Sequence, residues 1–356
     1  MFLRNAWYVA AWDREVTAER PFARVLLNEP VVLYRTRAGK VVALEDRCCH
    51  RHFPLHEGSI VADLIECGYH GFTYDATGKC VRVPGQDSVP PAARVRSYPV
   101  VERYRWVWVW MGEPAAADPA KICDFHWLDH PAWGAKGAVL HVKANYELII
   151  ENLLDLTHLA FLHRSTIGNA ATADQAQVRA QRTETDVTVT RWMVDTPPPP
   201  TYVKAGGFTG NIDRWQFINF MPPAFVRLDV GACAAGVGAR RLKTGPFAAE
   251  GTMPGGIEMR NLNAITPETE RSTHYFWAQA HNFMVDDPKM TELVFEQVKT
   301  AFDQDVTAIE AQQRNIDRDP VAPRVDVNGD AGQIHAIRLL RRRIAEEREA
   351  AGRLVA

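Results

Sequence analysis

Two short cysteine–histidine pairs constrain this chain more than any other feature of its sequence. Cys48 and His50 are separated by one residue, and Cys67 and His70 are separated by two within the segment Cys67–Gly71. Spacings this close let a single loop present a thiolate and an imidazole to a metal, and the glycines of the second pair relax its backbone. Together, the two loops offer four metal ligands.

These four ligands are compatible with two kinds of site. Two thiolates and two imidazoles suit a structural, tetrahedral zinc ion. They also suit a [2Fe-2S] cluster in which one iron takes both cysteines and the other takes both histidines, which raises the potential for single-electron transfer. The spacing alone does not distinguish the two sites.

The sequence around these pairs has the pattern of a β-rich domain. Short apolar runs such as Val31–Tyr34 alternate with turn residues, and Trp106–Trp110 alternates as a half-buried strand should. A Pro/Ala-rich connector follows at residues 113–119. We therefore place a boundary there, which gives domains 1–114 and 115–356.

Beyond the connector, the sequence mixes helices and strands. Helical patterns cover Tyr146–Leu162 and Pro288–Asn315. Strands separated by Gly/Pro-rich loops are predicted at 187–190, 216–220, 225–230 and 273–279. The fold class expected for the whole chain is α+β.

Charge and hydropathy exclude several classes of protein. The 356 residues carry 41 Lys+Arg against 43 Asp+Glu, a balance that argues against a nucleic-acid partner. The longest apolar stretches are far shorter than the roughly 20 residues of a membrane-spanning helix, and the start of the chain lacks an export-signal pattern. Six cysteines without such a signal are expected to be thiols or ligands. We expect a cytoplasmic protein without a membrane partner.

A second group of metal-binding residue types lies between Glu151 and His163. At about 100° per residue, Glu151, Asp155 and His158 fall on one face of a helix. His163 is rotated by about 140° from that face, so both histidines could bind one ion only if the helix ends or bulges between them. Gly168 lies close enough to permit such an ending. Taken alone, the pattern is also compatible with two unrelated histidines.

The two cysteine–histidine pairs resemble a known motif. Cys48-x-His50 followed by Arg51, and the segment Cys67–Gly71, are similar to the motif of Rieske [2Fe-2S] domains. This resemblance implies that Cys48 and Cys67 hold one iron of the cluster. It also implies that His50 and His70 hold the other iron, at the tips of two β-hairpin loops.

The spacing Asp-x-x-His-x-x-x-x-His from Asp155 to His163 resembles the segment that mononuclear iron oxygenases of the Rieske family carry. The resemblance implies that His158 and His163 are two ligands of a two-histidine, one-carboxylate iron(II) site with open positions for dioxygen and substrate. Asp305 is the expected third ligand because it stands five residues before a glutamate, as the family ligand does. Asp303 is the alternative.

The resemblance implies further roles. Asp155 would hydrogen-bond a histidine of the mononuclear site and, across a subunit boundary, a cluster histidine of the next chain in a head-to-tail homotrimer. Asn152 resembles the asparagine beside the iron. The expected fold is an N-terminal all-β Rieske domain followed by a C-terminal α+β catalytic domain with an antiparallel sheet and flanking helices.

Other segments narrow the resemblance to one branch of the family. Asn5–Ala10, Asn152–His158 and Ile265–Glu270 are similar to the vanillate O-demethylase and toluenesulfonate methyl-monooxygenase branch. Those oxygenase subunits use dioxygen and electrons from a separate flavin and [2Fe-2S] NAD(P)H-dependent reductase to hydroxylate a methyl carbon or O-demethylate an aromatic substrate. Since the chain has no Gly-x-Gly-x-x-Gly nucleotide fingerprint, we expect a partner reductase. An aromatic acid is the expected substrate class.

Two residues are candidates for substrate contact. Arg227, in the predicted strand Phe225–Val230, could pair with a carboxylate or sulfonate. Asn263 is a further pocket candidate. A ring-dihydroxylating dioxygenase and a simple Rieske electron carrier remain alternative functions, and a zinc-stabilised binding module is a third.

Overall fold

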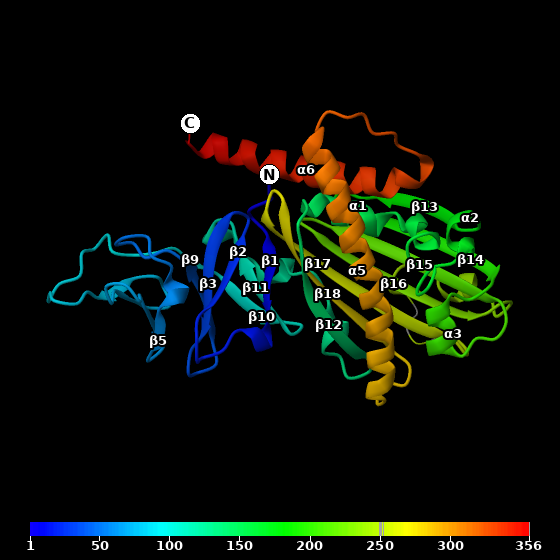
Figure 1. The fold of residues 1–356 in the computed structure, drawn as a ribbon, viewed down its shortest axis with the longest axis horizontal. Helices are drawn as coiled ribbons and strands as arrows, with labels where there is room; N and C mark the ends of the chain where they lie inside the picture. Colours follow the sequence, from blue (N-terminus) through cyan, green and yellow to red (C-terminus); the bar gives the residue numbers. More distant parts are fainter. Residues whose placement is uncertain (249–250, 252, 356) are drawn as a thin grey trace. The chain divides into compact units, whose positions relative to one another are not determined.

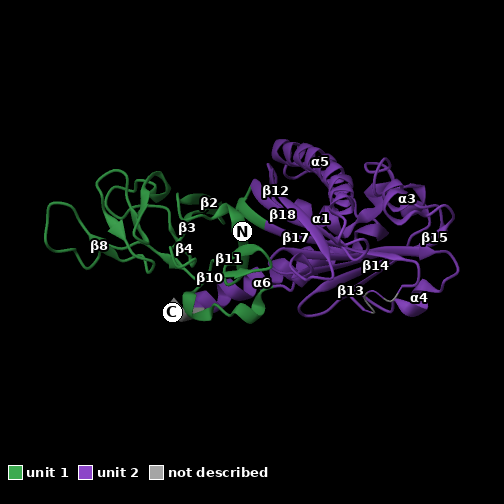
Figure 2. Cartoon of the chain, turned by 90° about the horizontal axis from the view of Figure 1, so that it is seen from below, with its two compact units in different colours: residues 1–122, 266–270 green, residues 123–265, 271–356 purple. Residues whose placement is uncertain are grey.

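The computed structural model describes residues 1–248, 251 and 253–355. The chain divides into two compact units, which Figure 2 shows in different colours. Unit 1 comprises Met1–Ile122 with Thr266–Glu270, and unit 2 comprises Cys123–Ile265 with Arg271–Ala356. Among the described residues, no helix combines the length and the apolar character needed to cross a membrane.

Unit 1 is built from three small sheets, with strand orders β1-β11-β10, β2-β3-β4-β9 and β5-β6-β7-β8. All their neighbouring strands pair antiparallel. The strands are β1 (Trp7–Trp12), β2 (Phe22–Leu26), β3 (Glu29–Arg35), β4 (Val41–Glu45), β5 (Ser59–Val61), β6 (Leu64–Glu66), β7 (Thr73–Tyr74), β8 (Cys80–Arg82), β9 (Ser97–Tyr98), β10 (Val100–Arg103) and β11 (Trp106–Trp110). The cysteine–histidine pairs lie in the β4–β5 and β6–β7 connections.

The strand β11 is buried on both faces, whereas its alternation predicted a half-buried strand. Val107 and Val109 join the hydrophobic core on one side. On the other side, tryptophans meet edge to face, with Trp110 against Trp7 at 5.5 Å between ring centroids. The half-buried prediction is wrong here because an indole is amphipathic: the ring of Trp110 packs while its N–H donates to the carbonyl of Glu113 at 2.9 Å.

Unit 2 is organised around a seven-stranded antiparallel sheet with the order β12-β18-β17-β16-β15-β14-β13. Its strands are β12 (Gly134–Val142), β13 (Gln177–Arg182), β14 (Val187–Thr196), β15 (Ile212–Met221), β16 (Phe225–Ala234), β17 (Ile257–Thr269) and β18 (Ser272–His281). Its helices are α1 (Tyr146–Leu154), α2 (Ala170–Asp174), α3 (Pro200–Gly206), α4 (Ala239–Leu242), α5 (Pro288–Arg318) and α6 (Ala331–Val355). The sheet and its flanking helices confirm the expected α+β class.

The long helix α5 crosses one face of this sheet, where it packs against β12 and β18 (Figure 1). It begins at Pro288 after an Asp287 cap, whose carboxylate accepts the N–H of Lys289 at 2.9 Å. Its apolar side chains face the sheet aromatics, and Phe295 stacks on Trp277 with 5.1 Å between ring centroids. The packing fixes α5 over the sheet and brings its buried face toward α1.

Candidate functional site

The two cysteine–histidine loops share one pattern of backbone hydrogen bonds. The N–H of Cys48 donates to the carbonyl of Phe53 at 2.9 Å, and the N–H of Cys67 donates to the carbonyl of Phe72 at 2.8 Å. Each cysteine carbonyl accepts from the N–H four residues later, at 2.9 Å in the first loop and 3.0 Å in the second. That residue has a positive φ in both loops, a conformation that Gly71 adopts freely. The cysteines therefore occupy equivalent positions in a repeated turn.

The four expected cluster ligands lie close together in unit 1. Cys48 and Cys67 are both buried, and the Tyr74 hydroxyl lies 3.0 Å from Sγ of Cys48. The rings of His50 and His70 meet with 4.6 Å between centroids. Nδ1 of His50 is buried and has no hydrogen-bond partner in the part of the chain that the structure describes, as expected of an atom whose partner is a metal.

These ligand atoms are too widely spread for a single zinc ion. Zinc bonds of about 2.0–2.3 Å keep all donor atoms within about 4.6 Å of one another. Among the residues that the structure describes, one group brings three ligand atoms within 4.8 Å of one another, and it includes none of these four side chains. Ligands shared between two irons need no such convergence. The residues present fit a [2Fe-2S] cluster.

The expected continuous helix over Tyr146–Leu162 is broken in the structure. Helix α1 ends at Leu154, and a 3-10 helix, η6, follows over Leu156–Ala160. Between them Asp155 is extended, and its carboxylate accepts the N–H of Thr157 at 2.9 Å. The prediction of one helix is wrong because this side chain caps a second helix and takes the backbone out of the α conformation.

A second helix end follows this break. The 3-10 helix η6 ends at Ala160, between His158 and His163, which is the ending that binding of a single ion was expected to need. After η6 the chain turns so tightly that a Cβ at Gly168 would lie 1.8 Å from the carbonyl oxygen of Leu159. With Gly168 in this turn, the two histidine rings approach to 5.1 Å between centroids.

His158, His163 and Asp305 converge on one point of unit 2. Nε2 of His163 lies 3.0 Å from Oδ1 of Asp305, and Nε2 of His158 lies 3.4 Å from the same oxygen. Asp305 projects from α5 and is 4% exposed. The three ligand atoms lie within 4.8 Å of one another. The structure thus brings together three residues that the sequence places in two distant segments.

Hydrogen bonds determine which nitrogen of each ring faces this point. Nδ1 of His158 donates to the Asp155 backbone carbonyl at 2.7 Å, and Nδ1 of His163 donates to Oε1 of Gln304 at 2.7 Å. Each neutral ring therefore directs the Nε2 lone pair at the Asp305 carboxylate, which also offers only lone pairs. Three such groups need a cation between them, so the donor set fits iron(II). The contribution of Gln304 was not predicted.

Protonation of the two histidines differs. Burial lowers the pKa of His158 and keeps this ring in the neutral form that binds metals. For His163, burial also favours the neutral ring, but the hydrogen bond and charge of Asp305 outweigh it and raise the pKa. A metal at this point competes with a proton on His163.

Asn152 and Asp155 contact the three converging residues in different ways. Nδ2 of Asn152 donates to Oδ1 of Asp305 at 3.0 Å. Asp155 contacts His158 through its backbone carbonyl, which lies 2.7 Å from Nδ1 of that ring. The Asp155 carboxylate instead lies 3.8 Å from Nη1 of the buried Arg191.

Asp303, the alternative third ligand, faces away from this point. Its carboxylate is 48% exposed and pairs with Lys299 of the same helix at 2.6 Å. Two residues along a helix correspond to a rotation of about 200°, so Asp303 and Asp305 lie on nearly opposite sides of α5. The geometry favours Asp305.

A cavity adjoins the three converging residues and is lined mainly by apolar side chains. The apolar lining residues are Leu153, Leu156, Leu159, Ile167, Leu228, Val230, Met259, Val298 and Phe302. Its polar lining residues, besides His158, His163 and Asp305, are Asn152, Thr201, Tyr202, Arg214, Gln216, Asn261 and Gln279. A cavity with a largely apolar wall and convergent polar groups, beside three potential metal ligands, is the usual form of a small-molecule site.

Strand alternation places Arg227 outside this cavity. Leu228 and Val230 of β16 line the cavity, so Arg227 faces the other side of the sheet. There it donates to the carbonyl of Asp124 at 3.1 Å and to Oδ1 of Asn219 at 3.0 Å. Asn263, the other candidate for substrate contact, is also absent from the residues that line the cavity.

That candidate, Asn263, is fully buried in the sheet. Its amide nitrogen donates to the carbonyl of Val226 at 2.9 Å, and its oxygen accepts from the Tyr275 hydroxyl at 2.7 Å. Arg214 and Gln216 of β15, which were not predicted, do line the cavity. Polar and aromatic residues alternate from Arg214 to Phe217, a period of two that could have identified them.

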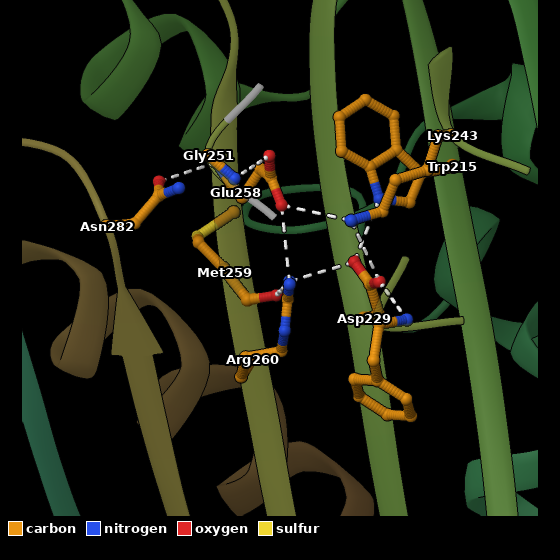
Figure 3. A network of polar contacts seen from close by, with 9 residues as sticks. Trp215, Asp229, Lys243, Gly251, Glu258, Met259, Arg260 and Asn282 are labelled. Carbon is orange, nitrogen blue, oxygen red and sulfur yellow. Dashed lines mark hydrogen bonds and ion pairs between the residues drawn. The ribbon is translucent and has the colours of Figure 1, made fainter. Parts of the chain in front are cut away.

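Four charged side chains form a closed network on the face of the sheet opposite the cavity (Figure 3). Nζ of Lys243 lies 3.1 Å from Asp229 and 3.0 Å from Glu258. Arg260 pairs with the same two carboxylates, at 2.8 and 3.3 Å. All four residues are at most 1% exposed. Because Lys243 comes from the β16–β17 connection, the network fastens that connection to the sheet.

Comparison with known families matches both units. The Rieske [2Fe-2S] domain family matches residues 6–99, and the vanillate O-demethylase oxygenase C-terminal domain family matches residues 142–346. The second match covers more than half of the chain.

Three characterised relatives are similar over nearly the whole chain. The toluene-4-sulfonate monooxygenase system iron-sulfur subunit of Comamonas testosteroni is 44% identical, over 93% of this chain and 94% of its own. A vanillate O-demethylase oxygenase subunit of a Pseudomonas species is 38% identical, over 99% and 97%. The crystal structure of dicamba monooxygenase bound to 3,6-dichlorosalicylic acid has a TM-score of 0.87 at 32% identity, over 98% and 99%.

These matches confirm the expected family and its two cofactors, a Rieske [2Fe-2S] cluster and a mononuclear non-heme iron; a further structure of dicamba monooxygenase contains the non-heme iron. The relatives are oxygenase components of multicomponent systems, which agrees with the expected type of enzyme. The chain belongs to the Rieske non-heme iron oxygenases, as the oxygenase component of a monooxygenase system.

Proposed function

We propose that this oxygenase uses dioxygen to hydroxylate a methyl carbon, or to remove a methyl group from an ether, of an aromatic acid. The observation that carries the proposal is the convergence of His158, His163 and Asp305 beside a largely apolar cavity. The apolar side chains would hold an aromatic ring and exclude water from the reacting carbon. Relatives named for toluene-4-sulfonate, vanillate and dicamba support an aromatic substrate with an acidic group.

The proposal assigns each metal-binding residue a role. In the Rieske domain, residues 1–114, Cys48 and Cys67 hold one iron and His50 and His70 hold the other. In the catalytic domain, residues 115–356, the triad holds the mononuclear iron and leaves positions open. The bound metals supply single-electron transfer and activation of dioxygen.

The remaining chemistry belongs to the side chains around the triad. Asn152 donates to the Asp305 carboxylate and holds its orientation. Gln304 and the Asp155 carbonyl fix the ring tautomers of His163 and His158. These contacts restrict the three ligand atoms to the directions that one metal ion requires.

The proposal includes partners. A separate flavin and [2Fe-2S] NAD(P)H-dependent reductase would supply electrons, in keeping with the multicomponent systems of the relatives. A head-to-tail homotrimer would let Asp155 join the mononuclear site of one chain to the cluster of its neighbour. A cytoplasmic location fits the six free thiols of the chain.

Replacing Asp155 with asparagine tests its place in this electron path. The amide keeps the shape of the side chain, and the backbone carbonyl still accepts from His158, so both metal sites should remain filled. We expect turnover to fall by about 10- to 100-fold, the range that outer-shell partners of metal ligands contribute. Iron and sulfide analysis with steady-state turnover checks this result.

A matched control lies one turn earlier on α1. Glu151 pairs with Arg324 at 2.7 Å, and Glu151→Gln should leave turnover unchanged. Normal turnover in Asp155→Asn would contradict the bridging role of Asp155.

A single turnover tests the function directly and needs no reductase. The chain is purified anaerobically, reduced chemically, and mixed with oxygen and a panel of aromatic acids and aryl methyl ethers. We expect mass spectrometry to find a monohydroxylated product, or a demethylated one together with formaldehyde. The same protein without mononuclear iron is the control and should form no product.

Other outcomes of this experiment would favour other functions. A cis-diol would indicate a ring-dihydroxylating dioxygenase. A holoprotein that contains the cluster but never binds mononuclear iron would indicate an electron carrier. Absence of product with both metal centres intact would contradict the proposed substrate class.

A further inference from the structure

Arg214 of β15 is a buried cation in the wall of the cavity. It is 3% exposed and belongs to the lining residues. Its Nη2 donates to the carbonyl of Ile167 at 3.0 Å. Its Nε and Nη1 are buried and have no hydrogen-bond partner among the described residues, which leaves the three N–H groups of these two atoms unused.

Among the described residues, no acidic side chain pairs with this guanidinium. The Tyr202 ring lies 4.6 Å from it and provides a cation–π contact, which offsets only part of the cost of burial. The neighbouring Asp213 points to the other side of the strand, where it accepts the N–H of Asp195 at 3.0 Å. Burial of an unpaired charge is costly, and the guanidinium of an arginine is a permanent cation in proteins.

The other buried arginines of the described residues differ from Arg214 in this respect. Arg260 pairs with two carboxylates in the network of Figure 3. Arg191 lies 3.8 Å from the Asp155 carboxylate and donates to the carbonyl of Thr172 at 2.6 Å. Of these three, only Arg214 lacks an acidic partner among the described residues, and it is also the one that lines the cavity.

Gln216 adds a second unpaired group to the same wall. It lies two residues from Arg214 on β15, so both side chains share a face of the sheet. Its Oε1 is buried and has no hydrogen-bond partner among the described residues. The amides of Asn261 and Gln279, by contrast, bond to each other at 3.0 Å. Unpaired polar groups therefore gather at one place in the lining.

We propose that Arg214 recognises the anionic group, a carboxylate or sulfonate, of the aromatic substrate that occupies this cavity. The free N–H groups of Arg214 would donate to the anion oxygens in charge-assisted hydrogen bonds. The inference rests on the proposed function, because it takes the occupant of the cavity to be the substrate. Arg214 is then a specificity-determining residue: a ligand without the anion leaves its charge unpaired.

Calorimetric binding to the anaerobic holoenzyme tests this proposal with matched pairs of probes. Each anion is compared with its neutral amide: 4-methylbenzenesulfonate with 4-methylbenzenesulfonamide, and 4-methoxybenzoate with 4-methoxybenzamide. We expect the native protein to bind each anion at least about 10-fold more tightly than the amide, since a hydrogen bond to a charged group contributes about 10- to 150-fold.

Variants of Arg214 test whether this residue causes the preference for anions over amides. Arg214→Met should weaken binding of both anions by about 10- to 150-fold and leave binding of the amides unchanged. Arg214→Lys should retain part of the anion preference, because it keeps the charge but not the planar group. Arg179→Met removes an exposed arginine from β13 of the same sheet and should bind all four probes like the native protein.

Several results would overturn the proposal. They are equal affinity of the native protein for anion and amide, no binding of any probe, and equal weakening of both probe types in Arg214→Met. If Arg214→Met does not fold, the native preference and Arg214→Lys decide the question. Two results would separate this proposal from the proposed function. If the anions bind through Arg214 but single turnover gives no product, only the proposed function is overturned. If single turnover converts the amides and not the anions, only the role of Arg214 is overturned.

Discussion

Asp305→Ala is expected to lose the mononuclear iron and keep the Rieske cluster. The native chain should contain about three irons and two acid-labile sulfides, and the variant about two of each. The carboxylate is the sole charged member of the triad, and without it His158 and His163 face each other as two neutral donors. Turnover should fall by more than about 100-fold, since even loss of an outer-shell partner costs 10- to 100-fold.

Asp303→Ala is the matched control for this experiment. It removes a carboxylate from the same helix, two residues away, whose partner is the exposed Lys299. We expect its iron content and turnover to be those of the native protein. Iron and sulfide analysis, with the visible spectrum of the cluster, separates the two sites. A full iron count in Asp305→Ala with a loss in Asp303→Ala would move the third ligand to Asp303.

Lys243→Met is expected to destabilise the protein by about 3–5 kcal/mol. The network of Figure 3 balances two cations against two carboxylates, all of them out of contact with water. Removal of Lys243 leaves Asp229 and Glu258 to share Arg260. Urea unfolding followed by circular dichroism measures the loss, and the midpoint should fall without a change in the metal content of the folded protein.

Two further variants show whether charge imbalance causes this loss. Lys299→Met breaks an exposed pair with Asp303 and should cost less than about 1 kcal/mol. Adding Glu258→Gln to Lys243→Met restores the balance of charge and should recover part of the lost stability. Equal urea midpoints for Lys243→Met and Lys299→Met would show that the buried network contributes no more to the free energy of unfolding than a surface ion pair.

The sequence was most informative where chemistry restricts both residue type and spacing. The sequence indicated a metal-binding set because thiolates and imidazoles are typical metal ligands and here stand at short spacings in two pairs. The set consists of Cys48, His50, Cys67 and His70. The helix α5 was predicted to start at Pro288, as it does, because proline and its preceding cap signal a helix start locally. Asp305, the candidate third ligand of the mononuclear iron on this helix, was suggested by the family resemblance.

The break at Asp155 could not be predicted from helix periodicity. The run from Tyr146 to Leu162 is apolar at helical spacing on both sides of the break. What ends α1 is one hydrogen bond, from the N–H of Thr157 to the Asp155 carboxylate, in competition with the α-helical pattern. Periodicity reports which face is buried, and it does not report which of two local hydrogen-bond patterns is the more stable.

Arg214 was missed for a related reason. The predicted strand began at residue 216, whereas β15 begins at Ile212, so Arg214 lay outside the segment to which strand alternation was applied. In β16 the strand was predicted, but Arg227 was considered without the alternation that puts Leu228 and Val230 on the cavity side. Tertiary packing decides which face of a two-sided sheet forms a cavity, and the sequence pattern alone does not.

Asp155 joins two helices and contacts the triad through its main chain only. Its carbonyl orients the ring of His158, while its carboxylate faces Thr157 and Arg191. The direction of the His158 ring and the electric field beside it are thus set by two separate groups of one residue. We expect a change in side-chain charge at this position to leave the ring direction intact, so that the electrostatic contribution to the reaction can be varied without altering the proposed metal site.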